Sequence, residues 1–215
     1  IEKYNGCIIA DSVGLGKTFE IIAAAHFGKK LGIFQKPIIT GIKANVADIA
    51  KAYQILLPNA NILFATEKDY ELKNRQIFLN KIRNNNYDCV IMSHDNFEKI
   101  PQSLEVEESV LKSELNDVEE NLFNVENKNF SKKQLKGLEQ RKKTLTANLS
   151  AMNHRIRSRK DTGVLQFSDL GIDHIIVDES HKFKNLMFQT KHSRVAGLGN
   201  QEGSQRANNL LTAIR

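Results

Sequence analysis

One segment near the start of the chain constrains its fold more than any other. It reads Ile8-Ile9-Ala10-Asp11-Ser12-Val13-Gly14-Leu15-Gly16-Lys17-Thr18, an apolar run followed by a glycine-rich loop and a helix-forming stretch. Glycines let a backbone approach an anion closely, and the amino-terminal end of a helix attracts negative charge. Lys17 is placed to reach the outer phosphates of a nucleotide, and the Thr18 hydroxyl is placed to bind Mg²⁺. The segment therefore predicts a strand, a phosphate-binding loop and a helix, with the nucleotide held by Gly14, Leu15, Gly16, Lys17 and Thr18.

Short β-branched apolar runs bounded by turn residues recur along the chain and are typical of parallel strands covered on both faces. Helical patterns separate the first four of them. Strands that alternate with helices predict an α/β fold with a doubly wound sheet. The predicted strands are Gly6–Ala10, Pro37–Thr40, Ile62–Ala65, Cys89–Ser93 and His174–Val177, and the predicted helices are Thr18–Phe27, Val46–Leu57 and Asp69–Ile82.

The alternation stops between the fourth and fifth predicted strands. Residues Leu104–Ile156 carry apolar side chains at heptad spacing on both sides of a polar turn at 124–131. This spacing predicts an inserted antiparallel α-helical hairpin, packed as a coiled coil. The first helix is acidic and the second is basic, so the second either binds DNA or forms a solvated face paired with the first. The predicted domains are a nucleotide-binding lobe over 1–103 and 161–215 and a hairpin over 104–160.

A second chemical motif follows the last predicted strand. Ile175-Ile176-Val177 runs into Asp178-Glu179-Ser180-His181, so two carboxylates stand at the carboxyl end of an apolar strand. Asp178 is placed to bind Mg²⁺, and Glu179 is placed to accept the proton of an attacking water. His181 is predicted to sense the γ-phosphate, because no second ligand stands at zinc spacing. Together with the glycine loop, the motif predicts ATP hydrolysis with Lys17, Glu179 and His181 as the catalytic residues.

These motifs together resemble those of a known family. Asp178-Glu179-Ser180-His181 resembles motif II of the DEAD/DEAH-box ATPases. The continuation Lys182-Phe183-Lys184-Asn185 resembles the Snf-type branch of superfamily-two helicases and DNA translocases. Asp11 replaces the first glycine of the strict phosphate-loop pattern, as in the helicase variant, whereas Ser12 and Val13 depart from the Glu and Met usual in that branch. Segments 37–42 and 87–94 are also similar to the strands that precede motif II in that branch.

The resemblance covers most of Gly6–Ser93 and Gly163–Asn185. It implies the first RecA-like lobe of a motor that uses ATP and Mg²⁺ to move along duplex DNA. The hairpin and the run Arg194–Asn200 resemble bacterial plasmid and phage proteins that fuse such a motor to an adenine-N6 DNA methylase. The chain begins at Ile1 without methionine, so we expect a longer parent chain with a second RecA-like lobe and, if this finer resemblance holds, a methylase domain.

The resemblance also implies contacts with the DNA backbone from Lys43, near the start of the helix after the second predicted strand, and from Ser93 and His94, at the carboxyl end of the fourth. Such residues suit contacts with phosphates, which fix the position of the protein on the DNA but do not read the base sequence. A solvated lysine at a helix start and a helix-capping histidine remain equally open for Lys43 and His94. Two rival functions also remain open: an RNA-directed helicase lobe, and a non-hydrolysing nucleotide-binding module whose hairpin recruits a partner.

Composition fits these expectations. The formal net charge is +6 with a pI near 9.2, which favours polyanionic partners, chiefly nucleic acid. Cys7 and Cys89 lie in apolar runs and are predicted to be buried, reduced core residues. No apolar run approaches the roughly 20 residues that cross a membrane. The expected location is therefore the bacterial cytosol, without a membrane partner.

We predict that this chain alone binds ATP but hydrolyses it very slowly. In motors of this type a second lobe supplies arginines that stabilise the transferring phosphoryl group, and such an arginine contributes about 10³–10⁵ in rate. No Ser-Ala-Thr-like or Thr-Gly-Thr-like motif III follows Asp178–His181 in this sequence. The measurement is ATP hydrolysis by the purified chain with saturating duplex DNA. Turnover of about 1 s⁻¹ or more, within the ordinary enzyme range, would contradict the expectation.

Overall fold

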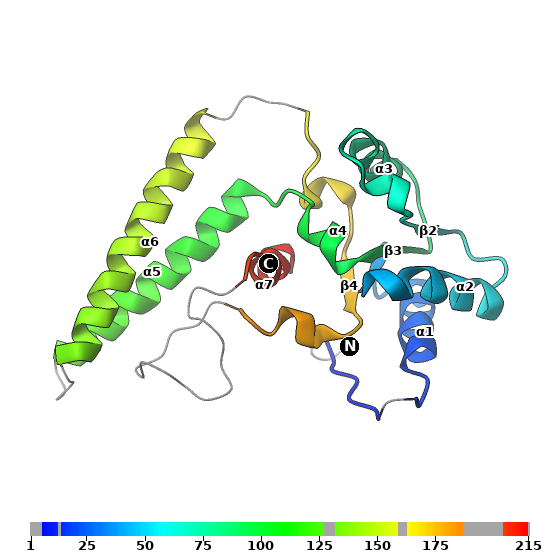
Figure 1. The fold of residues 1–215 in the computed structure, drawn as a ribbon, viewed down its shortest axis with the longest axis horizontal. Coiled ribbons are helices and arrows are strands. Elements are labelled where there is room, and N and C mark those ends of the chain that lie inside the picture. The colour runs from blue at the N-terminus through cyan, green and yellow to red at the C-terminus, as the bar shows by residue number, and fades with distance from the viewer. Residues whose placement is uncertain (1–5, 13, 127–131, 159–162, 187–203, 215) are drawn as a thin grey trace. The chain divides into compact units, whose positions relative to one another are not determined.

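The computed structural model describes residues 6–12, 14–126, 132–158, 163–186 and 204–214 (Figure 1). The chain divides into two compact units, Ile1–Pro101 with Leu165–His181, and Gln102–Val164 with Lys182–Arg215. The predicted lobe included everything from 161 onward, whereas the segment after His181 groups with the helical unit. The described part of that segment does so because helix α7 (Gln205–Ala213) contacts the first hairpin helix.

The first unit is built on a four-stranded sheet in which every pairing is parallel, which confirms the predicted α/β class (Figure 1). The strand order is β2-β3-β1-β4. The central strands β1 and β3 are buried along their whole length, as expected for strands with helices on both faces. The strands are β1 (Pro37–Gly41), β2 (Ile62–Phe64), β3 (Cys89–Ser93) and β4 (His174–Val177).

The predicted first strand, Gly6–Ala10, is wrong for this structure. Residues 6–12 are irregular and exposed, with Ile8 92% exposed, and the expected burial of Cys7 is also wrong because its thiol lies on the surface. A strand needs a neighbour whose backbone groups complete its hydrogen bonds. Among the described residues, the sheet ends with β4, and no strand pairs with this segment. Apolar, β-branched composition alone therefore did not produce a strand here.

Three helices of this unit lie close to their predicted positions, whereas the short fourth helix at His94–Glu98 was not predicted. The predicted third helix began at Asp69, but Glu67–Tyr70 forms a short 3-10 turn and α3 begins at Leu72. The Asp69 carboxylate accepts a hydrogen bond from the Thr66 backbone N–H at 2.8 Å, completing a capping box that sets this turn apart. The helices are α1 (Lys17–Lys30), α2 (Val46–Leu56), α3 (Leu72–Asn84) and α4 (His94–Glu98), and further 3-10 turns cover Lys43–Asn45, Phe167–Leu170 and Ser180–Phe183.

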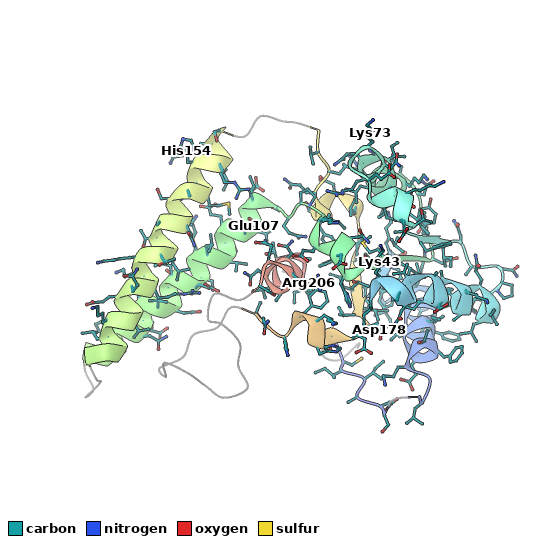
Figure 2. All side chains as sticks on the ribbon, in the orientation of Figure 1. Lys43, Lys73, Glu107, His154, Asp178 and Arg206 are labelled. Carbon is teal, nitrogen blue, oxygen red and sulfur yellow. The ribbon has the colours of Figure 1, made fainter. Side chains whose placement is uncertain are left out.

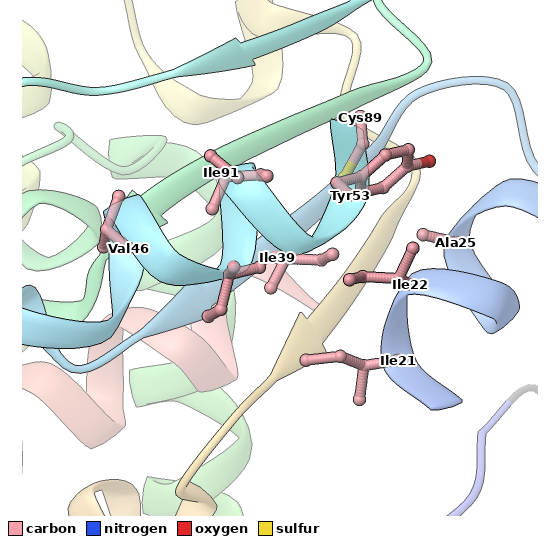
Figure 3. Packing of buried hydrophobic residues seen from close by; sticks show 10 residues of the cluster. Ile21, Ile22, Ala25, Ile39, Val46, Tyr53, Cys89 and Ile91 are labelled. Atoms are coloured by element: carbon pink, nitrogen blue, oxygen red, sulfur yellow. The ribbon is translucent and has the colours of Figure 1, made fainter. Parts of the chain in front are cut away.

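The main core lies between the sheet and helices α1 and α2 (Figure 3). Ile39 of β1 and Ile91 of β3 are neighbours in register and point to the same face, where Tyr53 of α2 is fully buried. Helix α1 contributes residues at helical spacing, so one stripe of the helix meets the sheet. The cluster contains Ile21, Ile22, Ala25, Ile39, Val46, Ile49, Ala50, Tyr53, Cys89 and Ile91.

The opposite face of the sheet is covered by α4 and the turn before β4. Thr40 is adjacent to Ile39 and so points the other way, where its hydroxyl lies 2.7 Å from Nδ1 of His94 in a buried hydrogen bond. Phe97 of α4 packs edge-to-face with Phe167 at a centroid distance of 5.6 Å. Both faces of β1 and β3 are therefore closed, as their continuous apolar sequences predicted.

The second unit contains two long helices at the position of the predicted hairpin. Helices α5 (Leu104–Glu126) and α6 (Lys132–Ser158) lie side by side and run antiparallel (Figure 1). Val118 of α5 and Leu145 of α6 are buried at positions where the apolar spacing placed the seam. The C-terminal α7 is capped by the Ser204 hydroxyl, which accepts a hydrogen bond from the Ala207 backbone N–H. Over the described residues, no helix combines the length and apolar character needed to cross a membrane.

Gly28 gives a sharp stability test. A Cβ atom at Gly28 would lie 2.1 Å from the ring of Phe34, and that ring is stacked at 4.1 Å on His174. Because the ring is buried and stacked on His174, it has little room to move away, and we predict that Gly28→Ala lowers the free energy of unfolding by about 1–3 kcal/mol. Gly137 of α6 is the matched control, because its Cβ would meet nothing within 4 Å. Gly137→Ala should raise the free energy of unfolding by about 1 kcal/mol, measured by denaturant unfolding. Equal changes in this free energy for the two substitutions would contradict the packing argument.

Candidate functional site

The strand register brings three of the segments that carry predicted site residues to one edge of the sheet. Gly41 of β1 pairs with Ser93 of β3, and Thr40 pairs with Val177 of β4, so these three parallel strands end together. The loops that follow therefore leave the sheet at the same edge, which is where open α/β sheets bind their ligands. Figure 2 shows Lys43 and Asp178 in the loops after β1 and β4.

The glycine loop precedes the first turn of α1. Gly14 and Gly16 have φ angles of 91° and 89°, the left-handed region that favours glycine, and Gly16 is the residue immediately before the helix. A Cβ at Gly14 would meet nothing within 4 Å, so there is open space beside the loop backbone. Lys17 folds back on the loop, where its Nζ donates to the carbonyl oxygens of Asp11 at 2.9 Å and Ser12 at 3.1 Å. The lysine ammonium is thus held where the chain turns into α1, with Thr18 next to it.

Glu20 is a neighbour of this loop that the motif analysis missed. Its carboxyl is hydrogen-bonded to the carboxyl of Asp11. That hydrogen bond, with smaller contributions from burial and from the negative charge of Asp11, raises the pKa of Glu20, while Lys17 opposes the shift. Glu20 stands three residues after Lys17 on a helix, and this spacing was the signal available in the sequence.

Asp178 is half-buried directly over the end of β1. Its backbone N–H donates to the carbonyl oxygen of Thr40 at 2.9 Å, and its Oδ2 would lie 3.7 Å from a Cβ at Gly41. A Cβ at position 41 would be in ordinary van der Waals contact with the carboxylate, and its tightest contact would be with Cδ1 of Ile49 at 3.2 Å.

The pKa of Asp178 is raised above its ordinary value by burial, and secondly by the negative charge of Glu179. Three groups oppose this shift: the backbone N–H of Glu179, the side chain of Asn45, which hydrogen-bonds to Asp178, and the positive charge of Lys17. The structure thus brings Lys17 of the glycine loop within electrostatic reach of Asp178. Asn45 follows Lys43 by two residues in the turn after β1, and nothing in its sequence context marked it as part of the site.

Glu179 and His181 form the exposed part of the site. Glu179 has a φ of 53°, the one positive φ of a non-glycine residue among those described. Such a conformation costs about 1–2 kcal/mol for an ordinary side chain and is common at functional sites. Its carboxylate lies 2.9 Å from Nδ1 of His181. The turn therefore sets the two predicted catalytic side chains together at the surface.

The residues predicted to contact nucleic acid are in different environments. Lys43 is exposed and its Nζ lies 2.8 Å from the carboxylate of Glu67, a partner that the sequence analysis did not identify. Hydrogen bonding between these two groups raises the pKa of Lys43 and lowers that of Glu67. Ser93 and His94 are only 1% and 3% exposed. Their predicted contact with a polymer stays a prediction, and in this conformation their side chains lie in the interior.

The whole chain, residues 1–215, matches the model of one protein family, described as "Probable helicase domain". The chain therefore belongs to this family of helicase domains. No curated protein gave a significant match to the chain. A helicase domain is, at a coarse level, part of a helicase-type or ATPase-type enzyme, which agrees with the glycine loop and the two carboxylates at one edge of the sheet.

Burial of Asp178 should cost stability, and this can be measured. A carboxyl whose pKa is raised on folding favours the unfolded state above its ordinary pKa of about 3.9, and the penalty disappears below that pH. We therefore predict that Asp178→Asn raises the thermal unfolding midpoint at pH 7, and that the difference vanishes near pH 3. Asp48→Asn on the exposed side of α2 serves as a control for net charge. A lower midpoint for Asp178→Asn at pH 7 would contradict the assigned cause.

Proposed function

We propose that this chain is the ATP-binding lobe of a DNA-dependent ATPase of the Snf-type translocase branch. The observation that carries the proposal is the convergence of Lys17 and Asp178. These residues belong to motifs that are 161 positions apart in the sequence, yet the positive charge of Lys17 is among the groups that lower the pKa of Asp178. A cation near a half-buried carboxylate, beside a glycine loop, suits a magnesium nucleotide.

The glycine loop would bind the β- and γ-phosphates of ATP. The open space beside Gly14 leaves room for an anion, and the amino-terminal end of α1 favours negative charge there. Lys17 would exchange its two carbonyl acceptors, on Asp11 and Ser12, for phosphate oxygens. A charged acceptor makes the stronger hydrogen bond, so phosphate binding would draw Lys17 away from the loop.

The residues present also fit Mg²⁺. The Thr18 hydroxyl and the Asp178 carboxylate are oxygen ligands of the kind Mg²⁺ prefers, and this ion is commonly held by one or two carboxylates together with substrate phosphates. The described residues contain no group of three or more His, Cys, Asp or Glu side chains that could hold a metal by itself. When bound, Mg²⁺ neutralises charge that develops on the phosphate oxygens. Asp178 would bind it in the ionised form, which Asn45 and Lys17 favour.

Glu179 would orient and deprotonate the attacking water. Its left-handed backbone conformation and exposed carboxylate set it apart from Asp178, so the two adjacent residues can have separate roles. His181 holds the Glu179 carboxylate through Nδ1 at 2.9 Å and would position it before the γ-phosphate. General-base catalysis of this kind contributes about 10²–10⁴ in rate.

The polymer would be duplex DNA, contacted through its backbone. Lys43 lies at the same edge of the sheet as Asp178 and is exposed, and a phosphate would compete with Glu67 for it. Because exposed ion pairs contribute little, Glu67 is displaced at small cost. The choice of DNA over RNA rests on the Snf-like sequence after His181, and a second RecA-like lobe and a methylase domain in a longer parent chain belong to the same proposal. Comparison of ATPase stimulation by duplex DNA and by RNA, in a parent protein with both lobes, would separate the two polymers.

The proposal predicts two different outcomes at Lys17 and Glu179. Lys17→Ala should weaken Mg²⁺-dependent ATP binding about 10- to 100-fold, the equivalent of one lost hydrogen bond to a charged group. Glu179→Gln should leave binding within about twofold, because its role concerns water rather than phosphate, and should slow hydrolysis by about 10²–10⁴ in a parent protein with both lobes. Calorimetric titration of the 215-residue chain with ATP, with and without Mg²⁺, measures the first part.

Lys30→Ala is the control for the lysine substitution, because it lies in the last turn of α1, far along the helix from the glycine loop. Unchanged ATP binding in Lys17→Ala would exclude the proposed phosphate site. Normal hydrolysis by Glu179→Gln would exclude its role as the base, and absence of hydrolysis in an otherwise intact two-lobe protein would favour the non-hydrolysing module instead.

A further inference from the structure

We propose that the outward face of helix α6 binds the phosphate backbone of nucleic acid, as a contact surface separate from the nucleotide site. The inference rests on the proposed function in one respect only, the choice of duplex DNA as the polymer. It concerns the helical unit by itself. Its starting point is the separation of charge between the two hairpin helices.

The two helices carry opposite charge almost without mixing. Helix α5 has eight acidic residues and one lysine, whereas α6 has eight lysines and arginines and one glutamate. A hairpin would be as stable and as soluble with acidic and basic residues mixed on each helix. This segregation therefore indicates that the charged side chains have a function of their own. The acidic residues of α5 are Glu105, Glu107, Glu108, Glu114, Asp117, Glu119, Glu120 and Glu126, and the basic residues of α6 are Lys132, Lys133, Lys136, Arg141, Lys142, Lys143, Arg155 and Arg157.

The cations of α6 that lie toward α5 are paired with it. Arg141 lies 3.3 Å from Glu114, and both side chains are less than one-fifth exposed. Lys142 lies 3.0 Å from Glu119, in a more exposed pair. Near the other end of the hairpin, burial raises the pKa of Glu107 and the positive charge of Arg155 opposes that shift (Figure 2). These pairs account for how the two helices recognise each other.

Three further cations lie on the other side of α6, together with one histidine. Lys136, Lys143 and His154 are spaced by seven and eleven residues, so they share the side of the helix opposite the buried Leu145, and Arg157 flanks them. All four residues are exposed. At 1.5 Å per residue the stripe extends for roughly 30 Å, about one turn of a DNA duplex. The single acidic residue of α6, Glu139, flanks the stripe.

The residues between these cations favour a nucleic-acid backbone over a membrane. Ala147 and Ser150 occupy the middle of the stripe and are exposed. Such small residues allow a polymer to approach the helix, whereas a helix that lies in a membrane surface presents large apolar side chains between its cations. The acidic α5 repels a polyanion, so the hairpin would bind DNA on its α6 side only. Phosphate contacts of this kind set position without sequence preference.

The test measures binding of the whole 215-residue chain to a fluorescent 30-base-pair duplex, without nucleotide, over a range of salt concentrations. The variant Lys136→Gln/Lys143→Gln/Arg157→Gln removes three cations and retains good helix formers. For B-DNA each phosphate contact contributes about 0.9 to the slope of log K against log salt, so the slope should fall by about 2–3. Affinity at low salt should fall on the order of 10- to 100-fold.

Two further variants control for net charge and for folding. Lys30→Gln/Lys51→Gln/Lys81→Gln removes three exposed cations from α1, α2 and α3 of the other unit and should leave the slope unchanged. Lys136→Arg/Lys143→Arg retains the charges and should bind like the unaltered chain. Circular dichroism checks that α6 remains helical in each variant.

The inference is overturned if the α6 variant and the net-charge control lose affinity equally, or if the α6 variant binds DNA normally. It is also overturned if vesicles containing phosphatidylserine bind the chain through α6 and duplex DNA does not. Failure here with normal ATP binding would leave the proposed nucleotide site intact. Conversely, Lys17→Ala, which removes the nucleotide site, should not change the slope of log K for DNA binding against log salt.

Discussion

The parallel pairing of β1 with both β3 and β4 is the constraint on which the candidate site depends. Because all three strands run the same way and end together, the turns after Gly41, Ser93 and Val177 leave the sheet at one edge. The pairing itself depends on burial of both faces of the sheet, since parallel strands are stable only when other elements cover them on both sides. Helices α1 and α2 close one face around Ile39, Ile91 and Tyr53, and α4 closes the other. The packing of the core and the geometry of the site thus have a common origin.

The site accepts electrostatic and conformational costs that its proposed function explains. Asp178 is half-buried with a raised pKa, and Glu179 has a left-handed backbone that its side chain does not favour. Neither arrangement contributes to folding, and a protein selected for stability alone would avoid both. Lys17 offsets part of the charge on Asp178 while it is held by loop carbonyls. Binding of a magnesium nucleotide would supply the opposite charges that these groups lack in the free protein.

Charge has a different role in the helical unit. In the first unit a few charged groups are set at fixed positions by the sheet, whereas the hairpin carries many charges along two helices. The partly buried pair of Arg141 and Glu114 belongs to recognition between α5 and α6, and Lys136 and Lys143 lie on the side that faces away from the seam. Heptad spacing predicted the helices and the seam, and the structure adds the division of the cations between an inner and an outer set.

The sequence by itself determined those features that depend on neighbours in the chain. Apolar runs, helix periodicity and the left-handed glycines Gly14 and Gly16 are local, so four strands, helices α1, α2, α3, α5 and α6, and a glycine loop before α1 followed from pattern alone. The tertiary structure alone decided what depends on partners distant in sequence. Gly6–Ala10 had strand composition but no neighbouring strand among the described residues, and Ser93, predicted at the end of a strand to contact DNA, is buried. The contact of Asn45 with Asp178 joins residues 133 positions apart, and such a contact exists only once the register of β1 and β4 is set.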